Sequence, residues 1–141
     1  MITSLRNPRI AAVRRLGRRR ERRATGLTTV DGPFLLEEAV AAGIAVHDVF
    51  VTADDTVGSR LAAAAAVTPT LVGDGVLRRL AGSVNPRSPV AVVEIPPPGA
   101  IEARDSVVMW EISDPGNAGT ILRTAAAFGF QVLTTSDSVD L

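Results

Sequence analysis

The residues best placed for chemistry lie in a short segment after residue 106. A strand-like run, 107–112, is followed by the loop Asp114-Pro115-Gly116-Asn117-Ala118-Gly119-Thr120 and by a helical run, 117–128. Such loops are where open α/β sheets bind ligands, because the helix N-terminus offers free N–H groups and a partial positive charge. We therefore expect an anionic or polar ligand here. The alternative is structural: Pro115 and Gly116 turn the chain and Asn117 caps the helix.

Arg123 strengthens the case for a site at this loop. Its neighbours in the predicted helix are apolar on nearly every side, which predicts a buried helix and an arginine that needs an anionic or carbonyl partner. That partner could be a ligand, or Glu111 or Asp114 in a structural ion pair. Asn117 and Arg123 are six residues apart and do not share a helix face, so they converge only if Asn117 precedes the helix.

A second candidate site is the N-terminal segment, which is strongly basic. Residues 1–23 hold nine arginines against one acid, Glu21, a net charge of +8, and the remaining 118 residues carry −8. This asymmetry points to a polyanionic partner, which could be RNA, DNA or an anionic membrane surface. The predicted phosphate ligands are arginines: Arg9, Arg14, Arg15, Arg18, Arg19, Arg20, Arg22 and Arg23.

The same segment is predicted to form one basic helix that Asn7 caps and that starts at Pro8. Its apolar stripe of Ile10, Val13 and Leu16 is narrow and contains no Trp or Phe, so membrane binding is the weaker interpretation. Paired contacts from arginine to phosphate oxygens suit the segment better. The alternative without a partner is a solvated basic face.

Composition excludes several classes of site. The chain has no cysteine, which excludes disulfides, a cysteine nucleophile and thiolate metal sites, and its single histidine, His47, excludes a multi-histidine metal centre. We therefore expect no metal. Aromatic residues make up only 4%, too few for a base-stacking platform of several exposed rings. No apolar run reaches membrane-spanning length and no secretory signal is present, so we expect a cytoplasmic protein with no membrane partner.

Alternation of strands and helices predicts an α/β fold with a parallel or mixed sheet. Before residue 96 we expect strands at 27–30, 46–52, 70–72 and 90–95, helices at 34–42, 61–66 and 76–80, and a loop at 85–89. The run Pro96-Pro97-Pro98-Gly99 denies the backbone both helix and central-strand pairing, so it marks a domain boundary. After it we expect one β-α-β unit with strands at 107–112 and 130–134. Such a unit cannot bury both faces of its sheet, and this predicts an unfinished second domain.

These residues carry a specific resemblance. The segment Glu111-Ile-Ser-Asp-Pro-Gly-Asn-Ala-Gly-Thr-Ile-Leu-Arg-Thr-Ala-Ala-Ala-Phe-Gly-Phe130 resembles the first signature motif of the SpoU/TrmH group of SPOUT RNA methyltransferases. Residues 2–10 and the basic segment resemble the start of that group's RNA-substrate-binding domain. Val30-Asp31-Gly32 resembles its Val-Glu-Gly turn, with Asp for Glu. Residues 85–93 resemble its Pro-Gln-Gly-Val loop and strand, with Arg87 and Ser88 departing from Gln-Gly.

The resemblance implies three parts. Residues 1–95 would form a three-layer α/β/α RNA-binding domain like certain ribosomal proteins, 96–105 a linker, and 106–141 the start of a trefoil-knotted methyltransferase domain that dimerises. The implied reaction moves a methyl group from S-adenosylmethionine to a ribose 2′-oxygen of structured RNA, usually ribosomal RNA. Arg123 and Asn117 match the catalytic motif, with Glu111 and Asp114 supporting them. A guanidinium group is already protonated and so cannot accept a proton as a general base. We therefore expect Arg123 to hold the substrate and stabilise negative charge.

The group's second and third motifs, which form the knot and most of the cofactor pocket, would lie beyond Leu141. We therefore expect the cofactor-binding residues outside this sequence and no methyl transfer by the 141 residues alone. A second hypothesis is a non-catalytic RNA-binding module that uses residues 1–95. A third, a nucleotide-binding α/β protein, is disfavoured because no Lys follows Gly119 and no GxGxxG fingerprint is present.

Overall fold

The computed structural model describes residues 1–80, 87–135 and 138. The chain divides into two compact units, Met1–Pro97 and Pro98–Leu141, which are considered separately below. The division falls inside the proline-rich segment 96–105. No helix in the described part of the chain combines the length and apolar character needed to cross a membrane.

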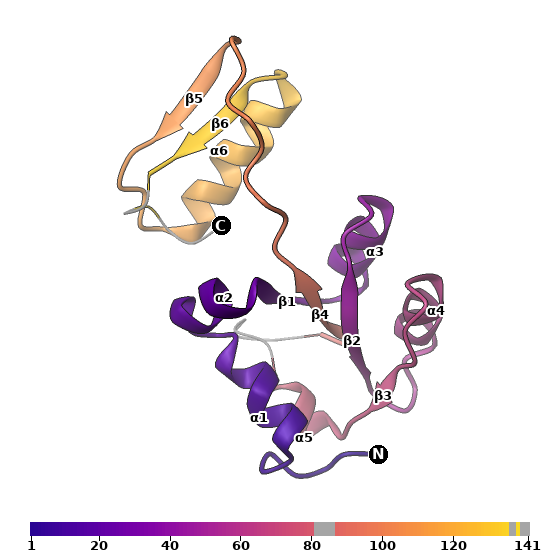
Figure 1. The fold of residues 1–141 in the computed structure, drawn as a ribbon. Helices are drawn as coiled ribbons and strands as arrows, with labels where there is room; N and C mark the ends of the chain where they lie inside the picture. The colour runs from indigo at the N-terminus through magenta and orange to yellow at the C-terminus, as the bar shows by residue number, and fades with distance from the viewer. Residues whose placement is uncertain (81–86, 136–137, 139–141) are drawn as a thin grey trace. The chain divides into compact units, whose positions relative to one another are not determined.

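The first unit is built on a four-stranded mixed sheet with strand order β1-β4-β2-β3 (Figure 1). Strand β4 runs antiparallel to both β1 and β2, whereas β2 and β3 are parallel. The predicted mixed α/β fold is therefore confirmed. In chain order the elements are α1 (Pro8–Arg15), α2 (Arg19–Thr25), β1 (Leu27–Asp31), α3 (Pro33–Ala41), β2 (Val46–Val51), α4 (Thr56–Ala64), β3 (Thr70–Leu71), α5 (Asp74–Leu77) and β4 (Val90–Glu94).

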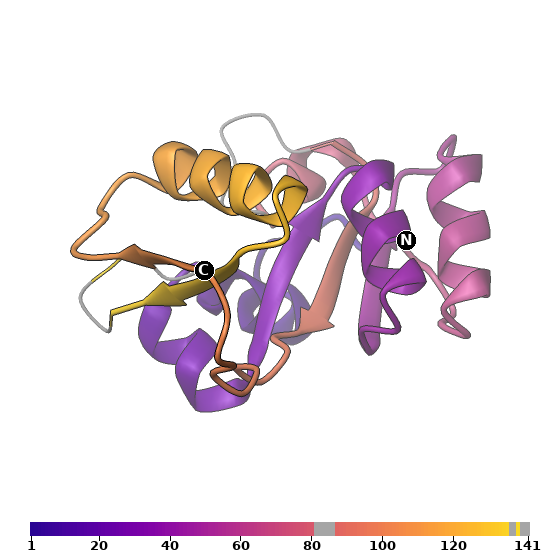
Figure 2. The same cartoon turned by 90° about the horizontal axis from the view of Figure 1, so that it is seen from above.

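The central strand β4 is buried on both faces, which gives the first unit three layers. Val90 and Val92 pack into one core with Ile10 of α1 and Leu77 of α5. Ala91 and the other alternate residues of β4 pack into a second core under α3 and α4. Helices α3 and α4 lie side by side on that second face (Figures 1 and 2). Because side chains alternate along a strand, the continuous apolar run of β4 requires helices on both faces.

Three of the predicted helices in this unit have bounds that differ by two or more residues, and one of them, α5, spans Asp74–Leu77 rather than 76–80. The predicted basic helix over 1–23 is two helices, because the chain leaves the α conformation after Leu16 and Arg18 is extended, with φ −100° and ψ 130°. Gly17, a poor helix former, lies at the break. Helix α4 starts at Thr56 rather than at 61, because the side chain of Asp55 accepts a hydrogen bond from Gly58 N at 2.7 Å and caps it.

The second unit is a β-α-β unit, as predicted. Strands β5 (Ser106–Met109) and β6 (Gln131–Thr134) are parallel, and α6 (Pro115–Ala127) connects them. Strand β5 ends three residues before the predicted 112. Helix α6 starts two residues earlier than predicted, because the side chain of Asp114 accepts a hydrogen bond from Asn117 N at 2.7 Å. Asp114, not Asn117, is thus the cap.

The two leucines at the start of α3 provide a test of the second core. Leu36 is fully buried, whereas its neighbour Leu35 is 46% exposed. We expect Leu36→Ala to lower the free energy of unfolding by about 2–5 kcal/mol, since it removes buried methyl groups and leaves a cavity. Leu35→Ala makes the same chemical change at the surface and should change it far less. Urea unfolding followed by circular dichroism measures both free energies. Equal losses of stability would contradict the burial of Leu36 in the second core.

Candidate nucleic-acid interface and candidate catalytic loop

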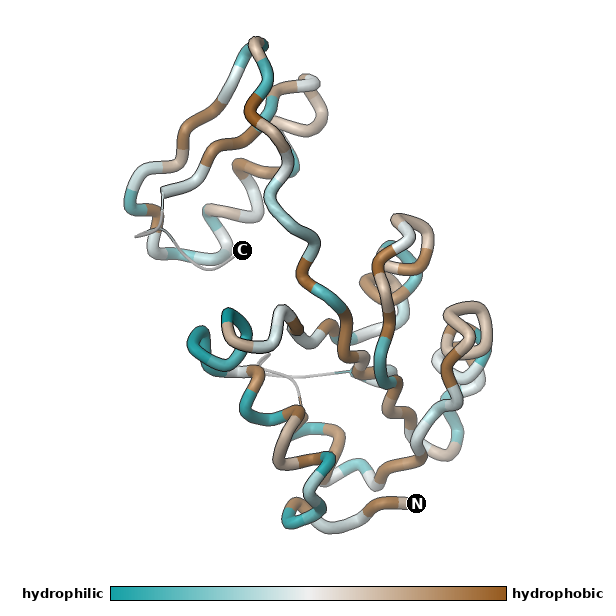
Figure 3. The backbone as a smooth tube through the Cα atoms, in the orientation of Figure 1, coloured by the Kyte–Doolittle hydropathy of each residue, from teal (hydrophilic) through white to brown (hydrophobic). Residues whose placement is uncertain are grey.

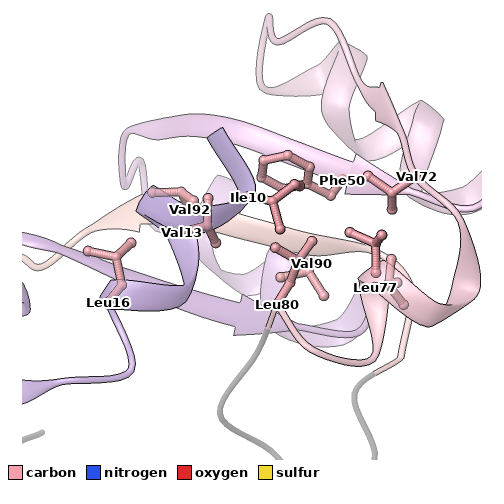
Figure 4. Packing of buried hydrophobic residues seen from close by; sticks show 10 residues of the cluster. Ile10, Val13, Leu16, Phe50, Val72, Leu77, Leu80, Val90 and Val92 are labelled. Atoms are coloured by element: carbon pink, nitrogen blue, oxygen red, sulfur yellow. The ribbon is translucent and has the colours of Figure 1, made fainter. Parts of the chain in front are cut away.

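The arginine-rich corner formed by α1 and α2 is held by its own side chains. Ile10 and Val13 of α1, together with its C-cap Leu16, point into the first core (Figure 4). Arg22 Nη1 of α2 donates a hydrogen bond of 3.0 Å to the carbonyl oxygen of Leu16. This bond satisfies a carbonyl at the C-terminal end of α1, which would otherwise lack a partner there. Arg22, a predicted RNA ligand, therefore supports the corner itself.

The predicted RNA-binding arginines divide into two groups. Arg9 pairs with Asp48 of β2, and the Arg15 Nε to Glu21 Oε2 distance is 3.7 Å. Arg19 and Arg23 are engaged as well. In contrast, Arg14, Arg18 and Arg20 are exposed, and their side chains make no hydrogen bond or ion pair with any described residue.

The helices α1 and α2 hold the most hydrophilic stretch of the unit (Figure 3). Three unpaired guanidinium groups at this surface leave positive charge that only a ligand or counter-ions can neutralise. The sequence could not show which arginines are already paired, because Asp48 is 39 residues from Arg9 along the chain.

Two segments that carry the family resemblance meet at one end of the sheet. The N–H of Gly32 donates to the carbonyl oxygens of Arg87 and Pro89, at 3.1 and 2.8 Å. Gly32 has φ +85°, a conformation that side chains rarely adopt. The turn after β1 and the loop before β4 therefore form one surface. Residues 85 and 86 of the predicted loop lie outside the described residues.

The turn after β2, which contacts the same loop before β4, is acidic. Ser88 Oγ donates to the carboxylate of Asp55 and accepts a hydrogen bond of 3.2 Å from Thr52 N. Nearby, a hydrogen bond from the side chain of Thr52, supplemented by one from the backbone, holds the pKa of the Asp54 carboxyl below its usual range. Asp54 is therefore ionised at neutral pH, and its charge opposes phosphate binding there.

In the second unit, the structure does not bring the predicted catalytic residues together. Asn117 lies inside α6 rather than in the loop before it, so Asn117 and Arg123 occupy different helix faces. Among the described residues, Arg123 pairs with neither Glu111 nor Asp114. Glu111 is exposed, with φ +50°, and its N–H donates to Thr135 Oγ1 at 3.4 Å.

Arg123 is exposed, and the expectation that it is buried is wrong. Only Ala118 and Ala125 of α6 are buried, because a two-stranded sheet covers just one side of the helix. Arg123 Nη2 lies 3.5 Å from Thr120 Oγ1, and a Cβ atom on Gly119 would lie 3.2 Å from its Nη1. The guanidinium group therefore folds back over Gly119 toward the N-terminal end of α6. Gly119 leaves room for it, which spacing alone did not reveal.

A groove of about 400 Å³ lies along α6 beside β5. It is lined by Val107, Thr120, Ile121, Thr124, Ala125, Phe128 and Phe130. S-adenosylmethionine carries an amine, a carboxylate and a polar base, all of which need polar partners. Two threonines in an apolar lining do not supply them, so this groove does not fit the cofactor. Among them, no group of three or more His, Asp or Glu side chains could hold a metal ion either.

The family of this chain follows from a match over most of the first unit. Residues 7–91 match the MRM3-like substrate binding domain, so the chain belongs to this family of substrate-binding domains. The match contains the α1–α2 corner and the Gly32 turn.

Named relatives are RNA methyltransferases. The chain is 37% identical, over 99% of its length, to an uncharacterized tRNA/rRNA methyltransferase of Synechocystis. It is 25% identical, over 96% of its length, to the 23S rRNA (guanosine(2553)-2′-O)-methyltransferase of Bacillus subtilis. It covers 54% of each of these proteins, so it spans about half the length of the curated relatives it matches.

A solved structure shows the same fold. The SpoU methyltransferase AviRb from Streptomyces viridochromogenes, in complex with the cofactor AdoMet, matches with a TM-score of 0.79 and 25% identity. The match covers 95% of this chain and 53% of that one, and so includes residues of both units. The predicted SpoU/TrmH resemblance is therefore confirmed.

Two arginines of α2, Arg20 and Arg22, are expected to differ in how much they stabilise the fold. We expect Arg22→Ala to lower the free energy of unfolding by about 1 kcal/mol, because the carbonyl of Leu16 loses a charged donor. Arg20→Ala removes the same charge at an exposed position without such a bond and should change it by less than about 0.5 kcal/mol. Urea unfolding of both variants measures the difference, and equal stability would show that the Arg22 contact does not hold the corner.

Proposed function

We propose that this chain is the RNA-binding part and the first β-α-β unit of an RNA 2′-O-ribose methyltransferase that acts on ribosomal RNA. The observation that carries the proposal is a triplet, Arg14, Arg18 and Arg20, that is exposed and unpaired among the described residues of a unit of the MRM3-like substrate-binding family. The names of the relatives support the reaction and the class of RNA. The whole reaction also needs a cofactor, for which we propose S-adenosylmethionine.

The arginine triplet binds RNA through its phosphates. Each guanidinium group presents N–H donors in a planar fork that matches two phosphate oxygens. Binding releases counter-ions from the RNA, so affinity falls as salt rises. Contacts of this kind position the RNA on the α1–α2 corner but do not read its sequence.

The candidate catalytic loop contributes through Arg123. A ribose 2′-hydroxyl is a poor nucleophile, so it must be oriented and its developing negative charge must be stabilised. A guanidinium group donates hydrogen bonds and carries positive charge, so Arg123 binds the substrate phosphate or ribose and favours a more anionic 2′-oxygen. Asn117 orients the substrate or the loop from the first turn of α6. S-adenosylmethionine would supply the methyl group when bound, through a site outside the described residues.

The second unit also supports assembly of two copies. Phe128 is 71% and Phe130 40% exposed, and their ring centroids lie 6.2 Å apart beside the apolar groove. An exposed apolar surface is typical of an interface. We therefore propose a homodimer formed through α6. We also propose a cytoplasmic location, because ribosomal RNA is present there.

Salt dependence tests the RNA-binding half of the proposal. Each of Arg14→Gln, Arg18→Gln and Arg20→Gln should weaken binding to ribosomal RNA fragments and reduce the slope of log K against log salt by about 0.7–0.9 per lost contact. Arg60→Gln, an exposed arginine of α4 on the other face of the sheet, is the control and should leave the slope unchanged. Fluorescence anisotropy at several salt concentrations measures it. If all four variants kept the slope of the unmutated chain, the RNA would bind elsewhere on the protein.

Methyl transfer tests the catalytic half. We expect activity when the chain is continued by the C-terminal half of the Synechocystis relative, and we expect Arg123→Ala in that protein to lower kcat by about a hundredfold. Arg104→Ala, an exposed arginine of the same unit, is the charge-matched control and should keep kcat. Transfer of labelled methyl groups to ribosomal RNA measures both.

Near-full activity of Arg123→Ala would remove the role proposed for this side chain. Normal RNA binding without methyl transfer in the unmutated protein would instead favour a non-catalytic RNA-binding module.

A further inference from the structure

A pocket of about 410 Å³ opens between the α1–α2 corner and the sheet of the first unit. Its floor is aliphatic and is formed by Val13, Leu16, Leu27 and Val92. Val13, Leu16 and Val92 lie next to one another in the core (Figure 4). The pocket has the volume of an ordinary small-ligand site. Neither the family match nor the names of the relatives assign anything to it.

The rim of the pocket is polar and carries both signs of charge. Arg9, Arg15 and His47 supply donors, whereas Glu21 and Asp48 supply carboxylates whose side chains are only 34% and 31% exposed. The charged groups of the rim pair with one another, Arg9 with Asp48 and Arg15 with Glu21, around an apolar floor. Such a site suits a ligand with flat apolar faces and a polar edge.

Arg9 is held in a defined orientation at this rim. Its guanidinium group pairs with Asp48 and lies 5.9 Å from the ring centroid of the buried Phe50. The carboxylate and the ring, both from β2, hold a planar, cationic group at the edge of the pocket. An arginine plane of this kind is a surface on which a nucleobase stacks.

The charges decide between the candidate occupants. A phosphate would face the carboxylates of Glu21 and Asp48, which repel it. An aliphatic side chain or lipid tail would fill the floor, but it would bury the ion pairs Arg9–Asp48 and Arg15–Glu21 against apolar atoms and add no hydrogen bond to them, which costs free energy. A nucleobase satisfies both parts, because its edge offers donors to the carboxylates and acceptors to the arginines.

The surroundings bring the RNA backbone to the same place. Arg14, Arg18 and Arg20 lie on or beside the two helices that border the pocket and remain unpaired among the described residues. Phosphates bound there would place the attached nucleotides beside the rim. A base can enter only if it is unpaired, since a base inside a duplex has its polar edge occupied.

We propose that this pocket receives one unpaired nucleobase of the RNA, stacked on Arg9, while the neighbouring arginines hold the flanking phosphates. The proposal rests on the RNA binding proposed above and narrows the substrate to a loop or bulge rather than a continuous duplex. Single-stranded loops and bulges are the elements whose bases proteins can read individually.

The test compares two RNA hairpins that differ by one nucleotide. One is fully paired and the other carries a single 2-aminopurine bulge. We expect the 141-residue chain to bind the bulged hairpin at least about fivefold more tightly and to change the 2-aminopurine fluorescence, which reports the environment of the base. Fluorescence anisotropy gives the two affinities at one salt concentration.

A matched pair of variants blocks the pocket without changing charge. Ala12 is exposed on α1 and lines the pocket, so Ala12→Leu fills it, whereas Ala24→Leu adds the same atoms on α2 away from it. Alanine and leucine have similar helix propensities, so both variants should fold. We expect Ala12→Leu to abolish the preference for the bulge and to keep binding to the paired hairpin, and Ala24→Leu to behave as the unmutated chain.

The outcomes separate this proposal from the proposed function. Absence of binding to either hairpin at low salt would overturn RNA binding and the pocket proposal with it. Salt-dependent binding with no preference for the bulge, or a preference that survives Ala12→Leu, would overturn the pocket proposal alone. Self-association that Ala12→Leu removes, without any bulge preference, would assign the pocket to a second copy of the chain and also overturn it.

Discussion

The packing of the α1 apolar stripe against the sheet is the contact on which the arginine-rich corner depends. Ile10, Val13 and Leu16 are at most 6% exposed. Because they occupy one face of α1, the arginines of that helix must lie on its remaining surface. The stripe ends at Leu16, so nothing would bury a continuation of the helix in the same direction. The break at Gly17 lets the chain turn and bring a second set of arginines over the same end of the sheet.

This arrangement gives similar residues different functions. Arg9 and Arg22 are tied to Asp48 and to the carbonyl of Leu16, and they hold the corner against the mutual repulsion of its charges. The exposed arginines are left with unneutralised charge, which gives affinity for a polyanion. A segment of uniform composition therefore contains both a structural frame and a binding surface. Only the three-dimensional partners distinguish the two.

Much of the fold could be predicted from the sequence because its signals are local. The cap at Asn7, the glycine-ended helices and the apolar run of β4 each depend on residues that are adjacent in the chain. The break in the basic helix and the exposure of Arg123 could not be predicted, since both depend on how much of a helix surface is covered by another element. The pocket could not be predicted either, because its lining comes from α1, α2 and strands far apart in sequence. The resemblance identified the residues of the candidate catalytic loop, but their separation on α6 follows from a cap, Asp114, one turn earlier than expected.

The two parts of the nucleic-acid interface differ in what they can contribute to recognition. Phosphate contacts through the arginines give affinity that every RNA shares and that salt weakens equally for paired and bulged RNA. A base held by Arg9 and by half-buried carboxylates adds free energy only for an RNA that offers an unpaired base. The ratio of the two affinities should therefore depend far less on salt than either affinity does. Selectivity of this kind suits a substrate-binding domain, since ribosomal RNA presents a great excess of phosphates to any basic surface and comparatively few accessible bases.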